Sequence, residues 1–206
     1  MTPDPINRLG VLISGRGSNL QALIDAIAAR RLNATIAVVI SNRANAAGLD
    51  RARAAGIEAI TLSHRAYATR DDYDRALVAE LQARDVGLVC LAGFMRLVGA
   101  PLIAAFPNRI LNIHPSLLPA FPGLDAQKQA IEHGVRVSGV TVHLVTAELD
   151  GGPIVVQRPV PVMPGDTAET LAARILEQEH VAYADAVQMM LDGGWRVDGR
   201  RFVAPE

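Results

Sequence analysis

Continuous apolar runs that alternate with helical segments constrain the fold of this chain more than any other feature. The runs cover residues 9–13, 36–40, 57–62 and 86–92. Strands that are apolar throughout, rather than at alternate positions, are typical of a parallel sheet with helices on both faces. We therefore predict an α/β fold with a mainly parallel, twisted sheet flanked by helices.

The second half of the chain predicts an antiparallel addition to this sheet. Residues 140–145 and 154–162 read as strands that pair antiparallel through a turn at residues 150–152. The other predicted elements there are helices over residues 126–132 and 167–191, the second capped by Asp166 or Thr167, and a hairpin around residues 198–199.

Bulk properties exclude several classes of protein. The 206 residues carry 20 Lys and Arg against 21 Asp and Glu, so charge gives no indication of a nucleic-acid or membrane surface. No apolar run reaches the ~20 residues of a membrane span, and no secretory signal precedes the first strand. Cys90 is the single cysteine and falls in a predicted buried strand. No His, Asp or Glu spacing indicates a metal site. We expect a soluble cytoplasmic protein that uses no metal.

A glycine-rich turn, Ser-Gly-Arg-Gly-Ser-Asn at residues 14–19, connects the first strand to the first helix. The N-terminus of a helix attracts anions, and glycine lets a phosphate approach the backbone. The dinucleotide-binding motif has a third glycine at the position that Leu20 occupies here. The turn therefore favours a phosphate over NAD, with a plain tight turn as the alternative.

Two polar residues end another short strand. Asn112 and His114 lie on the same face of this strand, directly before a Pro-rich segment that cannot continue a sheet. Ligands bind at the carboxyl ends of strands in open parallel sheets. An amide beside an imidazole suits a carbonyl that becomes an oxyanion. The spacing leaves open that both residues only cap a loop.

Other polar positions are less specific. Asp150 precedes two glycines and reads as an ordinary turn, but near His114 it would complete an acid–base set and raise the pKa of the imidazole. Residues 93–98 follow a strand and suit a flat heteroaromatic ligand, or else begin a helix. We expect His64, His133 and His143 to be structural or at the surface, because no motif surrounds them.

Four motifs in order resemble one family. They are ISGRGSNL at 13–20, LAGFMR at 91–96, NIHPSLLP at 112–119 and LDGGP at 149–153. Together they resemble the glycinamide ribonucleotide formyltransferases, folate-dependent enzymes of purine biosynthesis, over about residues 8–190. The resemblance implies a Rossmann-like formyltransferase fold and transfer of a formyl group from 10-formyltetrahydrofolate to the amine of 5'-phosphoribosylglycinamide. It implies small-molecule substrates and no metal, and it is compatible with a homodimer.

The resemblance also assigns parts of the chain. It implies one domain over residues 1–206, with a phosphate-binding half at about 8–105 and a folate and catalytic half at about 106–206. The catalytic set would be Asn112, His114 and Asp150. The acceptor would contact Gly17, Ser18, Asn19 and, through its ribose, Glu179. The formyl folate would contact Arg70, Met95, Arg96, Leu97, Val98, Asn112, Ala147 and Asp150. The family also implies a cis peptide before Pro119.

Four other functions compete with this interpretation. A methionyl-tRNA formyltransferase is expected to carry a further basic C-terminal domain, and a formyltetrahydrofolate hydrolase a regulatory N-terminal domain. A nicotinamide oxidoreductase is disfavoured by Leu20 and by Ser-Asn-Arg at residues 41–43, where an acidic residue is expected. A non-catalytic nucleotide-binding module would leave Asn112, His114 and Asp150 without a role.

Overall fold

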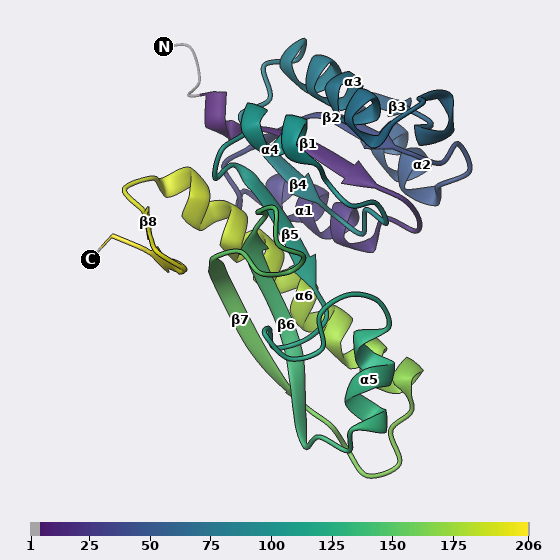
Figure 1. The fold of residues 1–206 in the computed structure, drawn as a ribbon, viewed down its shortest axis with the longest axis vertical. Coiled ribbons are helices and arrows are strands. Elements are labelled where there is room, and N and C mark those ends of the chain that lie inside the picture. The colour runs from purple at the N-terminus through teal and green to yellow at the C-terminus, as the bar shows by residue number, and fades with distance from the viewer. Residues whose placement is uncertain (1–4, 206) are drawn as a thin grey trace. The chain divides into compact units, whose positions relative to one another are not determined.

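The computed structural model describes residues 5–205, and it confirms the predicted α/β class (Figure 1). The chain divides into two compact units between Leu111 and Asn112. The assignment of the whole chain to one domain stays a prediction, and each unit is described here by itself.

The first unit contains a parallel sheet with strand order β3-β2-β1-β4. Its strands are β1 (Arg8–Ile13), β2 (Thr35–Ser41), β3 (Ala59–Thr61) and β4 (Leu88–Leu91). All of β4, and all of β1 after its first residue, is buried, which is why these runs are apolar throughout. The four predicted strands are confirmed, although β3 and β4 are shorter than the apolar runs.

Helices flank this sheet (Figure 1). They are α1 (Ser18–Ala28), α2 (Ala47–Ala54), α3 (Arg70–Gln82) and α4 (Ala100–Ala105), with 3₁₀ turns η1 (Pro5–Asn7) and η2 (His64–Ala66). The α1 helix buries Leu20 and Leu23, as its helical spacing predicts. No sequence pattern predicted the short α4, which has Pro101 in its first turn, where a missing backbone N–H costs nothing.

The second unit has the strand order β5-β6-β7-β9-β8. Its strands are β5 (Ile110–His114, which spans the division), β6 (Val137–Leu144), β7 (Ile154–Pro161), β8 (Arg196–Asp198) and β9 (Arg201–Val203). The predicted antiparallel pairing of β6 with β7 is confirmed, as is the terminal hairpin, in which β8 pairs antiparallel with β9.

Two helices complete this unit, α5 (Ala126–Glu132) and α6 (Ala168–Asp192). Thr167 caps α6 with a reciprocal pair of hydrogen bonds to Thr170, so the predicted cap is confirmed. The long α6 helix lies along β6 and β7 (Figure 1). Within residues 5–205, no helix has the length and apolar character that a membrane span requires.

Candidate active site

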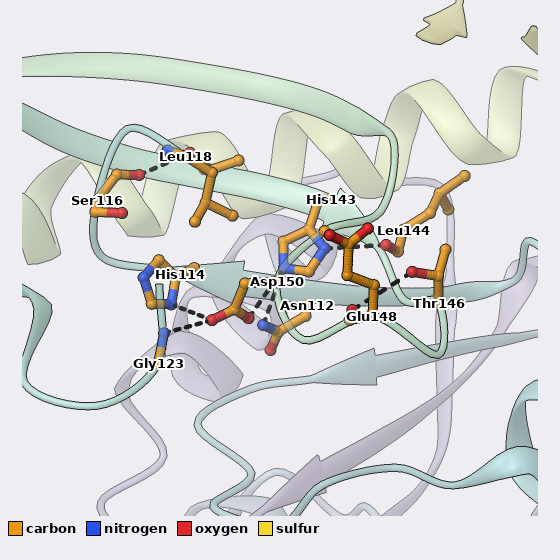
Figure 2. A network of polar contacts seen from close by, with 12 residues as sticks. Asn112, His114, Ser116, Leu118, Gly123, His143, Leu144, Thr146, Glu148 and Asp150 are labelled. Atoms are coloured by element: carbon orange, nitrogen blue, oxygen red, sulfur yellow. Dashed lines mark hydrogen bonds and ion pairs between the residues drawn. The ribbon is translucent and has the colours of Figure 1, made fainter. Parts of the chain in front are cut away.

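The polar residues at the end of β5 meet the turn between β6 and β7. The His114 Nδ1 atom lies 3.5 Å from Asp150 Oδ2, and both side chains are more than nine-tenths buried. Figure 2 shows the Asp150 carboxylate between the His114 ring and the Asn112 amide. The structure therefore brings together Asn112, His114 and Asp150, which are 38 positions apart at most, within the second unit.

His143 of β6 belongs to the same group, although no sequence motif pointed to it. Its Nε2 atom lies 3.2 Å from Asn112 Nδ2 and 3.6 Å from Asp150 Oδ1. We call Asn112, His114, His143 and Asp150 the Asp150 cluster. The sequence carried one signal for His143, a titratable ring in a buried apolar strand, but no local motif showed which residues the ring would contact.

Backbone carbonyls fix which nitrogen of each ring carries hydrogen. His143 Nδ1 donates to the Leu144 carbonyl at 2.9 Å, because a carbonyl can only accept. In neutral His143 the Nε2 atom then accepts from the Asn112 amide, and it can donate to Asp150 Oδ1, 3.6 Å away, only when the ring is protonated. His114 Nε2 likewise donates to the Phe121 carbonyl at 2.8 Å, which leaves Nδ1 facing Asp150. His143 thus orients the Asn112 amide and leaves its second N–H for another acceptor.

Burial controls the ionisation of His114. Burial lowers the pKa of its imidazole, and this outweighs the Phe121 hydrogen bond and the Asp150 charge, which act to raise it. Asp150 does act to raise the pKa of His114, as expected, but the net shift of that pKa is downward, so the expected direction is wrong. For Asp150, burial alone would raise the pKa of the carboxyl, but the His143 ring and the Gly123 N–H lower it overall. Burial therefore favours the neutral imidazole of His114, and the groups around Asp150 favour its charged carboxylate.

The Pro-rich loop, residues 115–125, forms hydrogen bonds with the Asp150 cluster and with β6. Gly123 N donates to Asp150 Oδ2 at 2.8 Å, and Phe121 accepts from His114. Nearer β5, Leu118 N donates to Thr141 Oγ1 at 3.0 Å. The Leu118–Pro119 peptide is cis, as the family resemblance implied. The loop is therefore bound through the same two side chains that the resemblance assigns to catalysis.

The turn that carries Asp150 has an unusual backbone. Asp150 has a φ of 49°, a left-handed conformation that Asp tolerates better than most residues. Gly152 follows, and a Cβ atom there would overlap the carbonyl oxygen of Leu144. Gly152 of the LDGGP motif therefore allows the close approach of this turn to the end of β6.

The glycine loop, residues 14–19, has the form of an anion site. Gly17 precedes α1 with a φ of 72°, and no side chain caps the helix. A Cβ at Gly17 would lie 2.6 Å from the Cα of Gly48, so the loop packs directly on α2. A cavity of about 240 Å³ opens over the loop and is also lined by Arg43, Gly93 and Met95. The N–H groups at the start of α1 remain uncapped by any side chain beside this cavity.

The segment predicted to line the folate site, residues 95–98, is a loop rather than the start of a helix. Met95 and Leu97 are exposed over 58% and 59% of their surface. The loop is tied at its end, because Asp74 Oδ2 accepts from Gly99 N at 2.6 Å. Arg70, at the start of α3, borders Gly99 as well. The first unit thus gathers the predicted folate residues Arg70, Met95, Arg96, Leu97 and Val98 around one loop.

Two predicted site residues, Glu179 and Ala147, belong neither to the Asp150 cluster nor to the two loops described above. Glu179 is buried on α6, and Ala147 is exposed in the connection between β6 and β7. Their proposed contacts with ribose and folate stay predictions. Among residues 5–205 there is no group of three or more His, Cys, Asp or Glu side chains that could hold a metal ion.

Comparison with known proteins agrees with these features. The family model described as formyl transferase matches residues 7–187. The chain belongs to the formyl transferase family. Phosphoribosylglycinamide formyltransferase of Escherichia coli is 47% identical over 183 residues, which are 89% of this chain and 86% of that protein. The predicted family is confirmed, and with it the expectation of an enzyme that transfers formyl groups.

A solved structure and a longer relative extend this result. The crystal structure of glycinamide ribonucleotide transformylase 1 from Symbiobacterium toebii superposes with a TM-score of 0.96 at 55% identity, covering 98% of this chain and 95% of that one. The trifunctional purine biosynthetic protein adenosine-3 of Drosophila pseudoobscura is 48% identical over 198 residues, 95% of this chain. This formyl transferase chain spans only 14% of the length of that relative.

Proposed function

We propose that this chain transfers the formyl group of 10-formyltetrahydrofolate to the primary amine of 5'-phosphoribosylglycinamide. The products are formylglycinamide ribonucleotide and tetrahydrofolate, in the de novo synthesis of purines. The observation that carries the proposal is that Asn112 lies beside the buried side chains of His114 and Asp150 in a chain of the formyl transferase family. The donor is a folate co-substrate, and no metal takes part in the steps below.

The residues of the Asp150 cluster suit a direct transfer. The amine nitrogen attacks the formyl carbon, and the carbonyl oxygen becomes a tetrahedral oxyanion. The bond from carbon to the folate nitrogen then breaks, while a proton passes from the amine to that leaving nitrogen. Asn112 has an N–H left for the oxyanion, since His143 takes the other. One such donor typically contributes about 10²–10³ in rate.

His114 is the proposed proton-carrying group. Its Nε2–H is bonded to Phe121 in this structure, so donation to an oxyanion requires that substrate replaces this carbonyl. Asp150, 3.5 Å from Nδ1, stabilises the imidazolium that forms when His114 takes up a proton. The carboxylate also accepts from Gly123 N and so couples the Pro-rich loop to the charge at His114.

The proposed substrate contacts are those that the family resemblance implies. The phosphate of the acceptor is proposed to bind the N–H groups and side chains of Gly17, Ser18 and Asn19, and its ribose to bind Glu179. The folate is proposed to contact Arg70, the loop at residues 95–98, Asn112, Ala147 and Asp150. The exposed Met95 and Leu97 support this, because they offer apolar surface to a flat ring.

The test is the absorbance change of a 10-formyl folate analogue mixed with the purified protein, with and without phosphoribosylglycinamide. Deformylation that depends on the acceptor is the expected result. Deformylation without the acceptor would instead make the chain a hydrolase. Absence of reaction in both mixtures, with a folded protein, would overturn the proposed acceptor and donor pair.

The predicted location and assembly are part of the same proposal. A cytoplasmic location, a homodimer and the absence of nucleic-acid partners are proposed from the sequence and the family. Sedimentation of the purified chain at several concentrations tests the homodimer directly.

A further inference from the structure

A second cavity in the first unit lies at the ends of three strands. Its volume is about 470 Å³, roughly twice that over the glycine loop. The polar residues that line it follow β2, β3 and β4, and they include Asn42, Arg43, Ser63, His64, Arg65 and Arg96. We call it the arginine cavity. The carboxyl ends of parallel strands are the usual place for ligands in such sheets.

The lining of the arginine cavity is positively charged, although Asp74, outside the lining, interacts electrostatically with Arg96. Arg43, Arg65 and Arg96 line it, and its lining includes no carboxylate. None of these three guanidinium groups forms an ion pair with any of residues 5–205, as the structure describes them. By contrast, the arginines that do form ion pairs are Arg53, Arg75, Arg84, Arg158, Arg174 and Arg200. Guanidinium groups bind phosphate oxygens with two parallel hydrogen bonds, so three around one cavity favour a multiply charged anion.

Hydrogen bonds through Ser14 and Asn42 orient the His64 ring, which is a further hydrogen-bond donor in the lining of the arginine cavity. Ser14 Oγ donates to Asn42 Oδ1 at 2.7 Å, and Asn42 Nδ2 lies 3.4 Å from His64 Nδ1. Since Nδ1 accepts from this amide, the hydrogen of the neutral ring is on Nε2. Burial lowers the pKa of His64, and the charges of Arg96, Arg65 and Arg43 lower it further. The ring therefore lies in the field of all three guanidinium groups.

The arginine cavity adjoins the cavity over the glycine loop. Arg43 and Met95 line both cavities. A ligand in one cavity therefore shares the Arg43 guanidinium with a phosphate in the other, and the two negative charges repel each other. Occupation of the arginine cavity should weaken the binding of a phosphate at the glycine loop.

We propose that the arginine cavity is a second anion site, which binds a ligand with a diphosphate group, such as a nucleoside diphosphate, and thereby weakens acceptor binding at the glycine loop. A diphosphate matches the three guanidinium groups, the Asn42 and Ser63 side chains and a volume twice that of the neighbouring cavity. The effect on the acceptor rests on the proposed function, whereas the binding of a diphosphate does not.

Binding is tested by titration calorimetry with inorganic pyrophosphate. Arg65 lines the arginine cavity and not the glycine-loop cavity, and it is exposed, so Arg65→Ser should fold normally. Loss of one charge-assisted contact should raise the dissociation constant about ten-fold. The matched control is Arg31→Ser, which removes the same charge from an exposed position after α1. Unchanged affinity in Arg65→Ser, or an equal loss in Arg31→Ser, would overturn the site.

Two further experiments test the chemical class of the ligand and its effect on acceptor binding. Tri-γ-glutamate offers carboxylates in place of phosphates, and binding of this peptide without binding of pyrophosphate would overturn the assignment to a diphosphate. Met95 and Arg96 line the arginine cavity and are also proposed folate contacts, so pyrophosphate in the formyl transfer assay should raise the KM for the folate as well as for the acceptor. Both increases should be smaller in Arg65→Ser. If the chain proves inactive with this acceptor, the calorimetric result still decides whether the site exists.

Discussion

The Asp150 carboxylate connects a loop, two imidazole rings and the proposed chemistry. One oxygen accepts from Gly123 N at 2.8 Å and lies 3.5 Å from His114, while the other lies 3.6 Å from His143. Its left-handed backbone at φ 49° is the local cost of this position. Asp150 therefore has both a structural and an electrostatic effect. A substitution that keeps the size of the side chain and removes its charge distinguishes the two effects.

We predict that Asp150→Asn folds but lowers kcat by about 10²–10⁴-fold, the range for a positioned acid–base group. The amide keeps the size of the side chain and an oxygen for Gly123, but it removes the charge that stabilises protonated His114. The measurement is steady-state formyl transfer beside a circular dichroism spectrum. Asp50→Asn, an exposed carboxylate on α2, is the control and should leave kcat unchanged. Near-normal turnover in Asp150→Asn would remove Asp150 from the mechanism.

His143 is predicted to act by orienting Asn112. His143→Phe keeps a planar ring but removes the acceptor for the Asn112 amide, so kcat should fall by up to about 10²-fold, the effect of one oxyanion donor. His143→Gln restores an acceptor and should recover part of kcat, with the KM for both substrates little changed. A purely structural role predicts instead that His143→Phe lowers thermal stability while kcat is retained.

The buried His114 should make stability depend on pH. Its ordinary pKa is 6.5 and burial lowers the pKa in the folded state. As the pH falls through 6.5, the unfolded chain takes up a proton that the folded chain resists, so the free energy of unfolding decreases. Urea unfolding between pH 7.5 and pH 5 should show this decrease.

His114→Asn provides the comparison. The decrease should be smaller in this variant, with a remainder from His64, whose folded pKa is also lowered. Equal decreases in the variant and the unmodified chain would show that His114 is not the group responsible.

At the scale of elements, the connection from β6 to β7 decides where Asp150 stands. Gly152 lies where a Cβ atom would overlap the Leu144 carbonyl, and Leu144 N donates back to the Pro153 carbonyl at 2.9 Å. The close approach at Gly152 therefore fixes both the turn and the end of β6.

We predict that Gly152→Ala lowers the free energy of unfolding by about 1–3 kcal/mol, the usual cost of overpacking, and also lowers kcat. Gly15→Ala is the control for stability, because nothing lies within 4 Å of a Cβ atom there and its φ is not positive. Chemical unfolding of both variants checks the prediction. A Gly152→Ala protein as stable as the control would mean that the turn adapts without cost.

At the scale of the whole molecule, ligand binding should appear as added thermal stability. Phosphoribosylglycinamide at one hundred times its dissociation constant should stabilise the chain by about 2.7 kcal/mol. For a chain of this size that corresponds to a rise in Tm of about 5–11 °C. NAD should give no shift, because Leu20 occupies the position of the third glycine in a dinucleotide site.

Variants of the glycine loop refine this measurement. Asn19 is buried in the first turn of α1, whereas Arg16 is exposed and its carbonyl is taken by Arg51. Asn19→Ala should therefore reduce the shift more than Arg16→Ala. The reverse order would contradict the placement of the phosphate.

The sequence by itself determined the class of fold and the order of most elements. Burial on both faces requires apolar strands without alternation, so the strands β1, β2 and β4 can be read from local pattern. The pairing of β6 with β7 also followed from local signals, a glycine turn between two apolar runs. The four motifs indicated the family, because they resemble that family and occur in the expected order along most of the chain.

Only the tertiary structure decided which polar groups meet and how they ionise. His143 contacts Asn112 across 31 positions of sequence, and nothing local to either residue indicates that contact. The direction of the His114 pKa depends on how deeply the packed unit buries the ring, which a neighbouring charge alone does not reveal. The arginine cavity likewise collects residues that follow three separate strands. Periodicity and turn chemistry act over a few residues, whereas contact and burial arise from sheet pairing between distant segments.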